Sequence, residues 1–106
     1  MSAAVRSTKS RPNWDWARPV YELRILDSAA RDLQKLDVQI ARRILARLRW
    51  LAENFDNIRP EALTGDMAGL LKLRVGDYRV IYEALPEDRV LVVHMIGHRR
   101  EVYRRR

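Results

Sequence analysis

The first clear pattern along the chain is a strict alternation of apolar and charged residues from residue 21 to residue 25 (YELRI). A period of two predicts a β-strand over residues 20–26 with one buried face. Asp27 and Ser28 follow directly, and residues of these types commonly cap the first turn of a helix. We therefore expect the chain to pass from this strand straight into a helix.

From residue 29 onwards the spacing of apolar residues lengthens to about 3.6, which predicts two consecutive α-helices. The first is short and ends near residue 36. The second begins at Asp37, carries an apolar stripe along one side, and must end before Pro60. Its arginines between residues 42 and 49 lie off the stripe, which favours a solvated face. The two helices are expected to form a hairpin that covers one face of a sheet.

Three further strands are predicted after a loop that contains two glycines. Their expected bounds are residues 70–75, 78–84 and 90–96. Gly76 and Asp77 join the first two strands, and glycine at the first loop position suits a type II′ hairpin turn. The whole pattern predicts an α+β fold. It consists of an N-terminal strand, a helical hairpin, and a three-strand antiparallel meander that completes a four-stranded sheet.

The tight turn also fixes the pairing between the first two strands of the meander. The odd positions of the first strand face the even positions of the second, and all of these residues are apolar or aromatic, so they form the core face. On the other face Arg74 lies opposite Arg79, with Lys72 beside them. Two cations directly across a ladder cost up to about 1 kcal/mol relative to neutral partners. This pairing predicts either a carboxylate that relieves the repulsion, such as Glu83, or a seat for a phosphate.

The last strand contains one histidine and ends just before another. An unbroken alternation places Leu91, Val93 and Met95 on one face, and it makes His94 a structural residue on a largely apolar strand. His98 differs, because two arginines follow it and disfavour an additional positive charge. A neutral imidazole at that position is able to act as a base or as a hydrogen-bond partner.

Composition narrows the class of protein. The chain has 106 residues, 47% of them hydrophobic, which suits one domain with a sizeable core. We expect residues 19–106 to form this domain and residues 1–18, which show no period, to be a flexible tail. The absence of cysteine excludes disulfide scaffolds, zinc ribbons and thiol nucleophiles. No apolar run approaches the ~20 residues of a membrane span and no secretory signal is visible, so a cytoplasmic protein without a membrane partner is expected.

The positive charge is unevenly distributed. Lys and Arg number 21 against 14 Asp and Glu, a net charge of +7, and the excess lies in residues 1–18 and 70–106. A basic surface concentrated in one region favours a polyanionic partner, with nucleic acid first. An arginine-rich composition without any functional cause predicts the same total. Charge alone therefore leaves both interpretations open.

Two segments carry a family resemblance. LLKLRVGDYRVIYEA at residues 70–84 and GHRREVY at residues 97–103 resemble the RelE branch of the RelE/ParE toxins of type II toxin–antitoxin systems. The expected order of elements is also similar. The resemblance implies a small RelE-like domain that enters the ribosomal A site and cuts messenger RNA without a metal or cofactor. In that chemistry the ribose 2′-hydroxyl attacks the adjacent phosphate and leaves a 2′,3′-cyclic phosphate and a free 5′-hydroxyl.

The resemblance also implies roles for single residues. Lys72 would act as base or charge stabiliser, and Arg74 would hold RNA phosphate. Arg79 and Arg99 would stabilise the charge of the transition state, and Tyr103 would stack on or orient the nucleotide. Without a metal, fixed cations must supply this stabilisation, and losing one costs roughly a hundredfold or more in rate. A stacked base contributes about 1–3 kcal/mol.

One departure from the family leaves the proton acceptor open. Members with the fullest catalytic set carry a second lysine where this chain has Leu70. We take His98, beside Arg99, as the candidate replacement. Arg100 and Arg104 extend the basic C-terminal segment and are expected to contact RNA.

Two alternatives to the ribosome-dependent endoribonuclease remain. A ParE-like toxin would share the fold and inhibit DNA gyrase without RNase activity, and a non-enzymatic module would bind RNA or protein. Retention of the residues above favours the endoribonuclease, whose partners are the ribosome and messenger RNA. Both toxin interpretations imply a cognate antitoxin in a hetero-oligomeric complex, bound as a helix or an added strand at the helical hairpin or a sheet edge.

Overall fold

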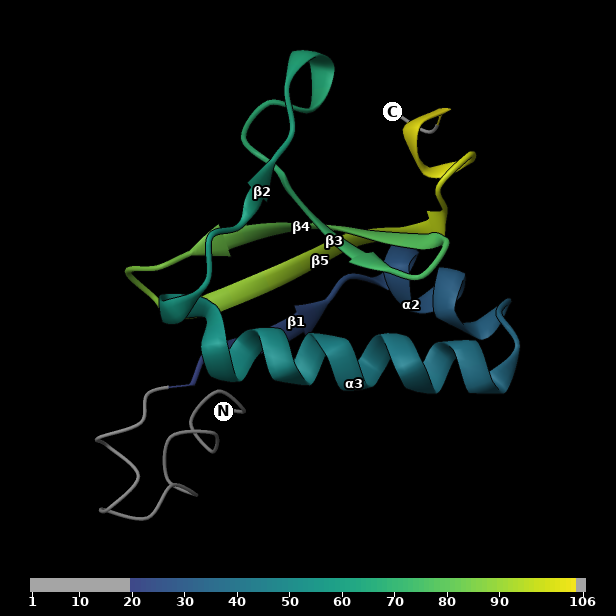
Figure 1. Cartoon of the computed structure of the whole chain (residues 1–106), viewed down its shortest axis with the longest axis horizontal. Coiled ribbons are helices and arrows are strands. Elements are labelled where there is room, and N and C mark those ends of the chain that lie inside the picture. Colours follow the sequence, from purple (N-terminus) through teal and green to yellow (C-terminus); the bar gives the residue numbers. More distant parts are fainter. Residues whose placement is uncertain (1–19, 105–106) are drawn as a thin grey trace.

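The helices and the C-terminal turn lie on opposite sides of one sheet, as Figure 1 shows for the computed structural model of the protein. The structure describes residues 20–104, so the tail predicted over residues 1–18 lies outside the described residues. The architecture is α+β, as predicted. None of the helices in the described part of the chain is long and apolar enough to span a membrane.

In the described part of the chain the sheet has five strands, in the order β1-β5-β4-β3-β2. β1 (Glu22–Ile25) runs parallel to β5 (Val90–His98), while β3 (Leu71–Val75), β4 (Tyr78–Leu85) and β5 form the predicted antiparallel meander. The four-stranded prediction misses β2 (Glu61–Ala62), which pairs with β3 at the edge. Two exposed residues are too few to show an alternation, so the sequence pattern does not mark this strand.

Two helices follow β1, namely α2 (Asp27–Gln34) and α3 (Val38–Asn54). α3 begins as predicted, because the Asp37 carboxylate accepts a hydrogen bond from the backbone N–H of Gln39 at 3.0 Å. Its apolar stripe is buried against the sheet. The fully buried residues of this stripe are Ile44, Leu48 and Leu51.

The cap predicted for the first helix is wrong. Asp27 already belongs to α2, and its N-cap position is Leu26, which makes no side-chain hydrogen bond. The Ser28 hydroxyl donates instead to the backbone carbonyl oxygen of His94 in β5, at 2.9 Å. This polar residue therefore docks the helix on the sheet rather than closing its first turn.

The pairing of β3 with β4 is the one predicted from the Gly-Asp turn, and it places Arg74 opposite Arg79. Gly76 has a φ of +60° whereas Asp77 has no positive φ, as a type II′ turn requires. All of the residues predicted on the inner face either belong to the core or pack against it. We call the opposite side of the sheet, turned away from α2 and α3, the outer face.

A bulge in β5 reverses the alternation of the strand, so residues after His94 lie on the opposite face from the one that an unbroken alternation predicts. Ile81 pairs with Met95, but the next residue of β4 pairs with Val93, so His94 is left over. The core therefore takes Ile96, and the prediction that Met95 shares a face with Val93 is wrong. β5 is apolar on both faces, so a skipped residue leaves no trace in the hydrophobic pattern.

Candidate functional site

The outer face of the sheet carries the predicted cations. Lys72 and Arg74 belong to β3, and Arg79 of β4 lies opposite Arg74 in the register. Two segments rise from this side of the sheet, the loop that carries β2 and the C-terminal turn Val102–Arg104 (Figure 1). These two segments bring further side chains to the cations.

Glu61 in β2 joins two of these cations. Its Oε2 lies 3.3 Å from Lys72 Nζ and 3.0 Å from a guanidinium nitrogen of Arg74. Desolvation works to raise the pKa of Glu61, but the hydrogen bonds and charges of Lys72 and Arg74 outweigh it, so this pKa lies below its ordinary value. The two cations thus converge on a single ionised oxygen.

The repulsion between Arg74 and Arg79 is relieved without Glu83. Arg74 turns towards Glu61, whereas the Arg79 guanidinium donates to two backbone carbonyl oxygens at the hairpin turn, at 2.9 and 3.0 Å. Glu83 is occupied elsewhere, 3.2 Å from His94 Nε2. Glu61, and not Glu83, is therefore the carboxylate that relieves the repulsion between Arg74 and Arg79.

The C-terminal turn places Tyr103 over Lys72. Lys72 Nζ lies 5.8 Å from the centre of the Tyr103 ring, within the range of a cation–π contact. The Lys72 side chain is only 16% exposed as a result of its contacts with this ring and Glu61. The Tyr103 hydroxyl is buried and has no hydrogen-bond partner in the described part of the chain, a rare condition for a buried polar atom. Val102, which is fully buried, anchors the turn.

The C-terminal arginines follow β5 at the hairpin end of the sheet. The backbone N–H of Arg99 donates to the Asp77 carbonyl oxygen at 2.8 Å, beside the turn that Arg79 contacts. Arg79 and Arg99 therefore lie at the same end of the sheet. Arg99, Arg100 and Arg104 are exposed.

His98 lies on the other side of the sheet from Lys72. It pairs with Tyr78 at the end of β5, and the two rings lie 5.6 Å apart and nearly perpendicular. Tyr78 packs against the core on the helix side, so His98 shares that side. Its Nδ1 accepts a hydrogen bond from the Arg100 backbone N–H at 3.2 Å. The structure thus brings Lys72, Arg74 and Tyr103 together and leaves His98 apart from them.

Sequence reasoning missed Glu61. The residue sits in a loop pattern between Pro60 and the glycines, and only its pairing opposite Lys72 reveals what it contacts. Nothing in the sequence distinguishes it from the other acidic residues of a chain that has 14. Within residues 20–104 there is no group of three or more His, Asp or Glu side chains that could hold a metal ion.

Comparison with known families gives one match that spans most of the chain. Residues 23–103 match the family model described as the ParE toxin of the type II toxin–antitoxin system parDE. No curated protein matches the chain in sequence.

Solved structures with a similar fold are toxins in toxin–antitoxin complexes or alone. The RelBE2 complex of Mycobacterium tuberculosis matches with 26% identity and a TM-score of 0.69, over 76% of this chain and 92% of that one. The RelE–RelB complex of Pyrococcus horikoshii matches with 27% identity and a TM-score of 0.62, over 78% and 99%. The isolated RelE toxin of E. coli matches with 26% identity and a TM-score of 0.63, over 79% and 92%. The family model and these structures name different branches of one superfamily.

Proposed function

We propose that this protein stops translation by cutting messenger RNA on the ribosome. The chain belongs to the ParE toxin family of type II toxin–antitoxin systems. Membership makes the protein a toxin of the RelE/ParE superfamily, and the reaction is our proposal. The support for it lies in the outer-face site, which we define as Lys72, Arg74, Glu61 and Tyr103. Arg79 and Arg99 extend this site from the hairpin end.

The observation that carries the proposal is the convergence of Lys72 and Arg74 on one oxygen of Glu61. A phosphate oxygen carries negative charge and accepts the same hydrogen bonds, so an RNA phosphate fits where the carboxylate lies. The Tyr103 ring beside it offers a face on which a base stacks. The site therefore combines an anion seat with an aromatic surface, as recognition of single-stranded RNA requires.

The proposed reaction forms a bond between the ribose O2′ and phosphorus and breaks the bond from phosphorus to the O5′ of the next nucleotide. The 2′-hydroxyl gives up its proton, and the leaving oxygen takes one up. Extra negative charge develops on the phosphate in the transition state, and in our proposal Lys72 and Arg74 stabilise it. Arg79 and Arg99 add positive charge from the end of the hairpin.

The proton acceptor is a separate part of the proposal. His98 was taken from the sequence, but its place beside Tyr78 puts it on the helix side of the sheet. Glu61 is a carboxylate that touches Lys72 directly, and its lowered pKa keeps it ionised near neutral pH. Loss of cleavage in His98→Ala assigns the role to His98. Loss of cleavage in Glu61→Gln with RNA binding retained assigns it to Glu61.

We propose further that a cognate antitoxin neutralises this toxin in a hetero-oligomeric complex in the cytoplasm. Two of the similar structures are complexes of a RelE-type toxin with its antitoxin. Within residues 20–104 β1 is an edge of the sheet, and an edge strand is able to take an added strand from a partner. Co-expression with the acidic product of a neighbouring gene is expected to give a stable complex.

A second function has one observation in its favour, since the matching family model is that of ParE. A ParE-like toxin would inhibit DNA gyrase and leave messenger RNA intact. The two functions are therefore separated by what happens to RNA.

Induced expression in bacteria tests the proposal, with growth, messenger ends and gyrase supercoiling activity followed together. The wild-type chain is expected to stop growth and to cut messengers within codons. Arg79→Ala is expected to cut roughly a hundredfold more slowly. Arg49→Ala, at an exposed arginine of α3, is the matched control and keeps the wild-type rate. Growth arrest with intact messengers and inhibited gyrase would replace our proposal with the ParE-like function.

A further inference from the structure

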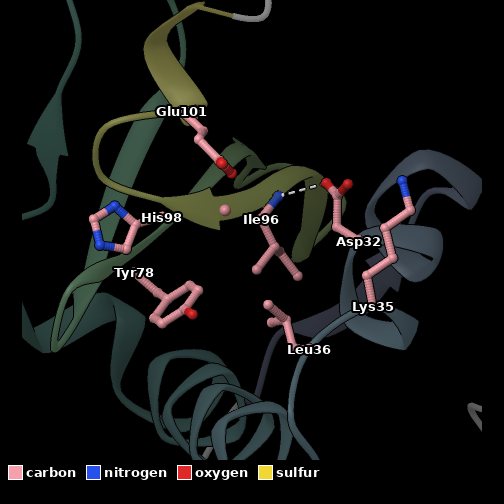
Figure 2. A pocket seen from close by; sticks show the side chains of 8 residues that line it. Asp32, Lys35, Leu36, Tyr78, Ile96, His98 and Glu101 are labelled. Atoms are coloured by element: carbon pink, nitrogen blue, oxygen red, sulfur yellow. Dashed lines mark hydrogen bonds between the residues drawn. The ribbon is translucent and has the colours of Figure 1, made fainter.

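The bulge in β5 is held in place by helix α2. The Ser28 hydroxyl donates to the carbonyl oxygen of His94 at 2.9 Å. The Asp32 carboxylate accepts a hydrogen bond from the backbone N–H of Ile96, also at 2.9 Å (Figure 2). Ser28 and Asp32 are four residues apart and therefore lie on the same side of α2. Together they fix the backbone from His94 to Ile96, where β5 carries one residue more than β4.

The extra residue of the bulge carries an imidazole on the outer face of the sheet. Val93 and Ile96 both belong to the core, so His94 and Met95 lie between them on the outer side. His94 has no partner in the register with β4. The chain has two histidines, and the other, His98, lines the pocket on the helix side (Figure 2). His94 is therefore the histidine that shares a face with the outer-face site.

His94 is held by Glu83 of β4, which lies on the same face. The distance from His94 Nε2 to Glu83 Oε1 is 3.2 Å. An ionised carboxylate only accepts hydrogen bonds, so Nε2 is the donor and Nδ1 is the nitrogen that is left. Within residues 20–104 Nδ1 makes no hydrogen bond. A carboxylate on one nitrogen orients the ring, and the other nitrogen is then able to exchange a proton with a substrate.

Stability is a weak reason for this pair. The side chains of His94 and Glu83 are 32% and 42% exposed, and an ion pair at such a position contributes at most about 1 kcal/mol. The bulge interrupts the ladder between β4 and β5, which works against stability. Bulges are frequent beside active sites, where they direct a side chain. A chemical role accounts for the arrangement better than stability does.

The pair lies next to the outer-face site. Lys72 pairs with Ile81, and Glu83 is the next residue of β4 on that face, about 7 Å further along the strand. His94 belongs to the neighbouring strand β5, which lies about 5 Å across from β4. An RNA strand that runs from a phosphate at Lys72 towards Glu83 would pass His94.

We propose that His94 donates the proton that the leaving 5′-oxygen takes up, and that Glu83 is the positioning residue that holds the imidazole for this step. This proposal rests on the proposed function and gives a residue to the proton donor, which was left without one. As the bond from phosphorus to O5′ breaks, its electron pair passes to O5′, which takes the proton from Nδ1 of the protonated imidazole. The ring is left neutral and regains a proton from water. The 2′-hydroxyl proton goes to a separate acceptor.

A messenger with sulfur in place of the leaving 5′-oxygen at the cleavage site tests this role. A thiolate leaves without a proton, because it is a much weaker base than an alkoxide. Cleavage of the oxygen and the sulfur messenger on the ribosome is compared with the purified full chain. His94→Gln keeps a side chain that is able to donate to Glu83. It is expected to cut the oxygen messenger roughly a hundredfold more slowly and the sulfur messenger at the wild-type rate.

A matched pair of variants tests the positioning residue. Glu83→Gln is expected to slow cleavage of the oxygen messenger by a smaller factor than His94→Gln and to leave cleavage of the sulfur messenger unchanged. Glu87→Gln, at an exposed glutamate of the turn between β4 and β5, is the control and keeps the wild-type rate on both. An equal loss on the two messengers would overturn the proposal, because His94 would then act before the bond breaks or merely support the bulge.

The proton donor and the proposed function fail in different ways. A wild-type chain that cuts the oxygen messenger no faster than His94→Gln keeps the reaction and removes only His94 from it. A wild-type chain that cuts neither messenger refutes the reaction and the proton donor together.

Discussion

Val102 offers a quantitative test of how the outer-face site is assembled. The residue is fully buried, lies outside the main core cluster and belongs to the turn that holds Tyr103 over Lys72. Val102→Ala removes two methyl groups from a buried position. At about 0.8 kcal/mol for each buried carbon, plus a small cavity, the expected loss is about 2 kcal/mol.

The loss is expected to fall on the turn rather than on the whole fold. The turn packs on β5, whereas α2, α3 and the inner sheet face keep their own core. A change of about 2 kcal/mol makes the undocked turn roughly 30-fold more populated. Tyr103 then leaves Lys72 for a larger fraction of the time, and cleavage slows with it.

Hydrogen exchange measures this local opening. The Arg104 amide donates to the Glu101 carbonyl oxygen at 3.0 Å, so its exchange is expected to accelerate by up to about 30-fold in Val102→Ala. Amides of β4 are expected to exchange as before. Val38→Ala, at a residue that is 61% exposed, is the matched control and changes neither. Unchanged exchange at Arg104 together with a melting temperature lower by several degrees would refute the reasoning, because Val102 would then belong to the global core.

Three further predictions follow from single contacts. Glu61→Gln is expected to tighten binding of a short RNA and to steepen the salt dependence of that binding, because no carboxylate then competes for Lys72 and Arg74. Fluorescence anisotropy measures both, and unchanged binding would contradict the expectation. The hydrogen bond from Arg89 holds the pKa of Asp56 below its ordinary 3.8, so the folded state binds this proton less readily than the unfolded state. The stability that this pair contributes is therefore present above pH 3.8 and is lost as the pH falls through the lower pKa that Asp56 has in the folded state. Asp56→Asn should remove this part of the acid-induced loss of stability, measured as the melting temperature at a series of pH values. Burial raises the pKa of Tyr82 to about 12, so an ultraviolet titration should show a tyrosine step near that pH which Tyr82→Phe removes.

The hairpin was predictable because local chemistry dictates it. A Gly-Asp pair between two alternating segments specifies a two-residue turn, and that turn fixes every cross-strand pair, including Arg74 with Arg79. The apolar stripe of α3 and its Asp37 cap were predictable for the same reason, since each depends on residues close in the sequence. The fold class follows from these elements.

The parts that were not predictable depend on contacts between distant segments. The bulge at His94 is invisible in a strand that is apolar on both faces, and it decides on which side of the sheet His98 lies. Glu61 reaches Lys72 only because a two-residue strand pairs at the edge of the sheet. The relative positions of Lys72 and Arg74, which belong to one strand, were therefore predictable from the sequence. The positions of Glu61 and His98 relative to them could be found only from the structure.

Cleavage of a ribosome-bound messenger by the purified protein, with chemical analysis of the new ends, tests most directly whether the outer-face cations hold the scissile phosphate. The wild-type chain is expected to leave a 2′,3′-cyclic phosphate on the upstream fragment and a 5′-hydroxyl on the downstream one. Lys72→Met is expected to cut roughly a hundredfold more slowly at an unchanged melting temperature. An intact messenger with the wild-type chain, or equal rates for the two proteins, would contradict the proposed role of Lys72 and its neighbours.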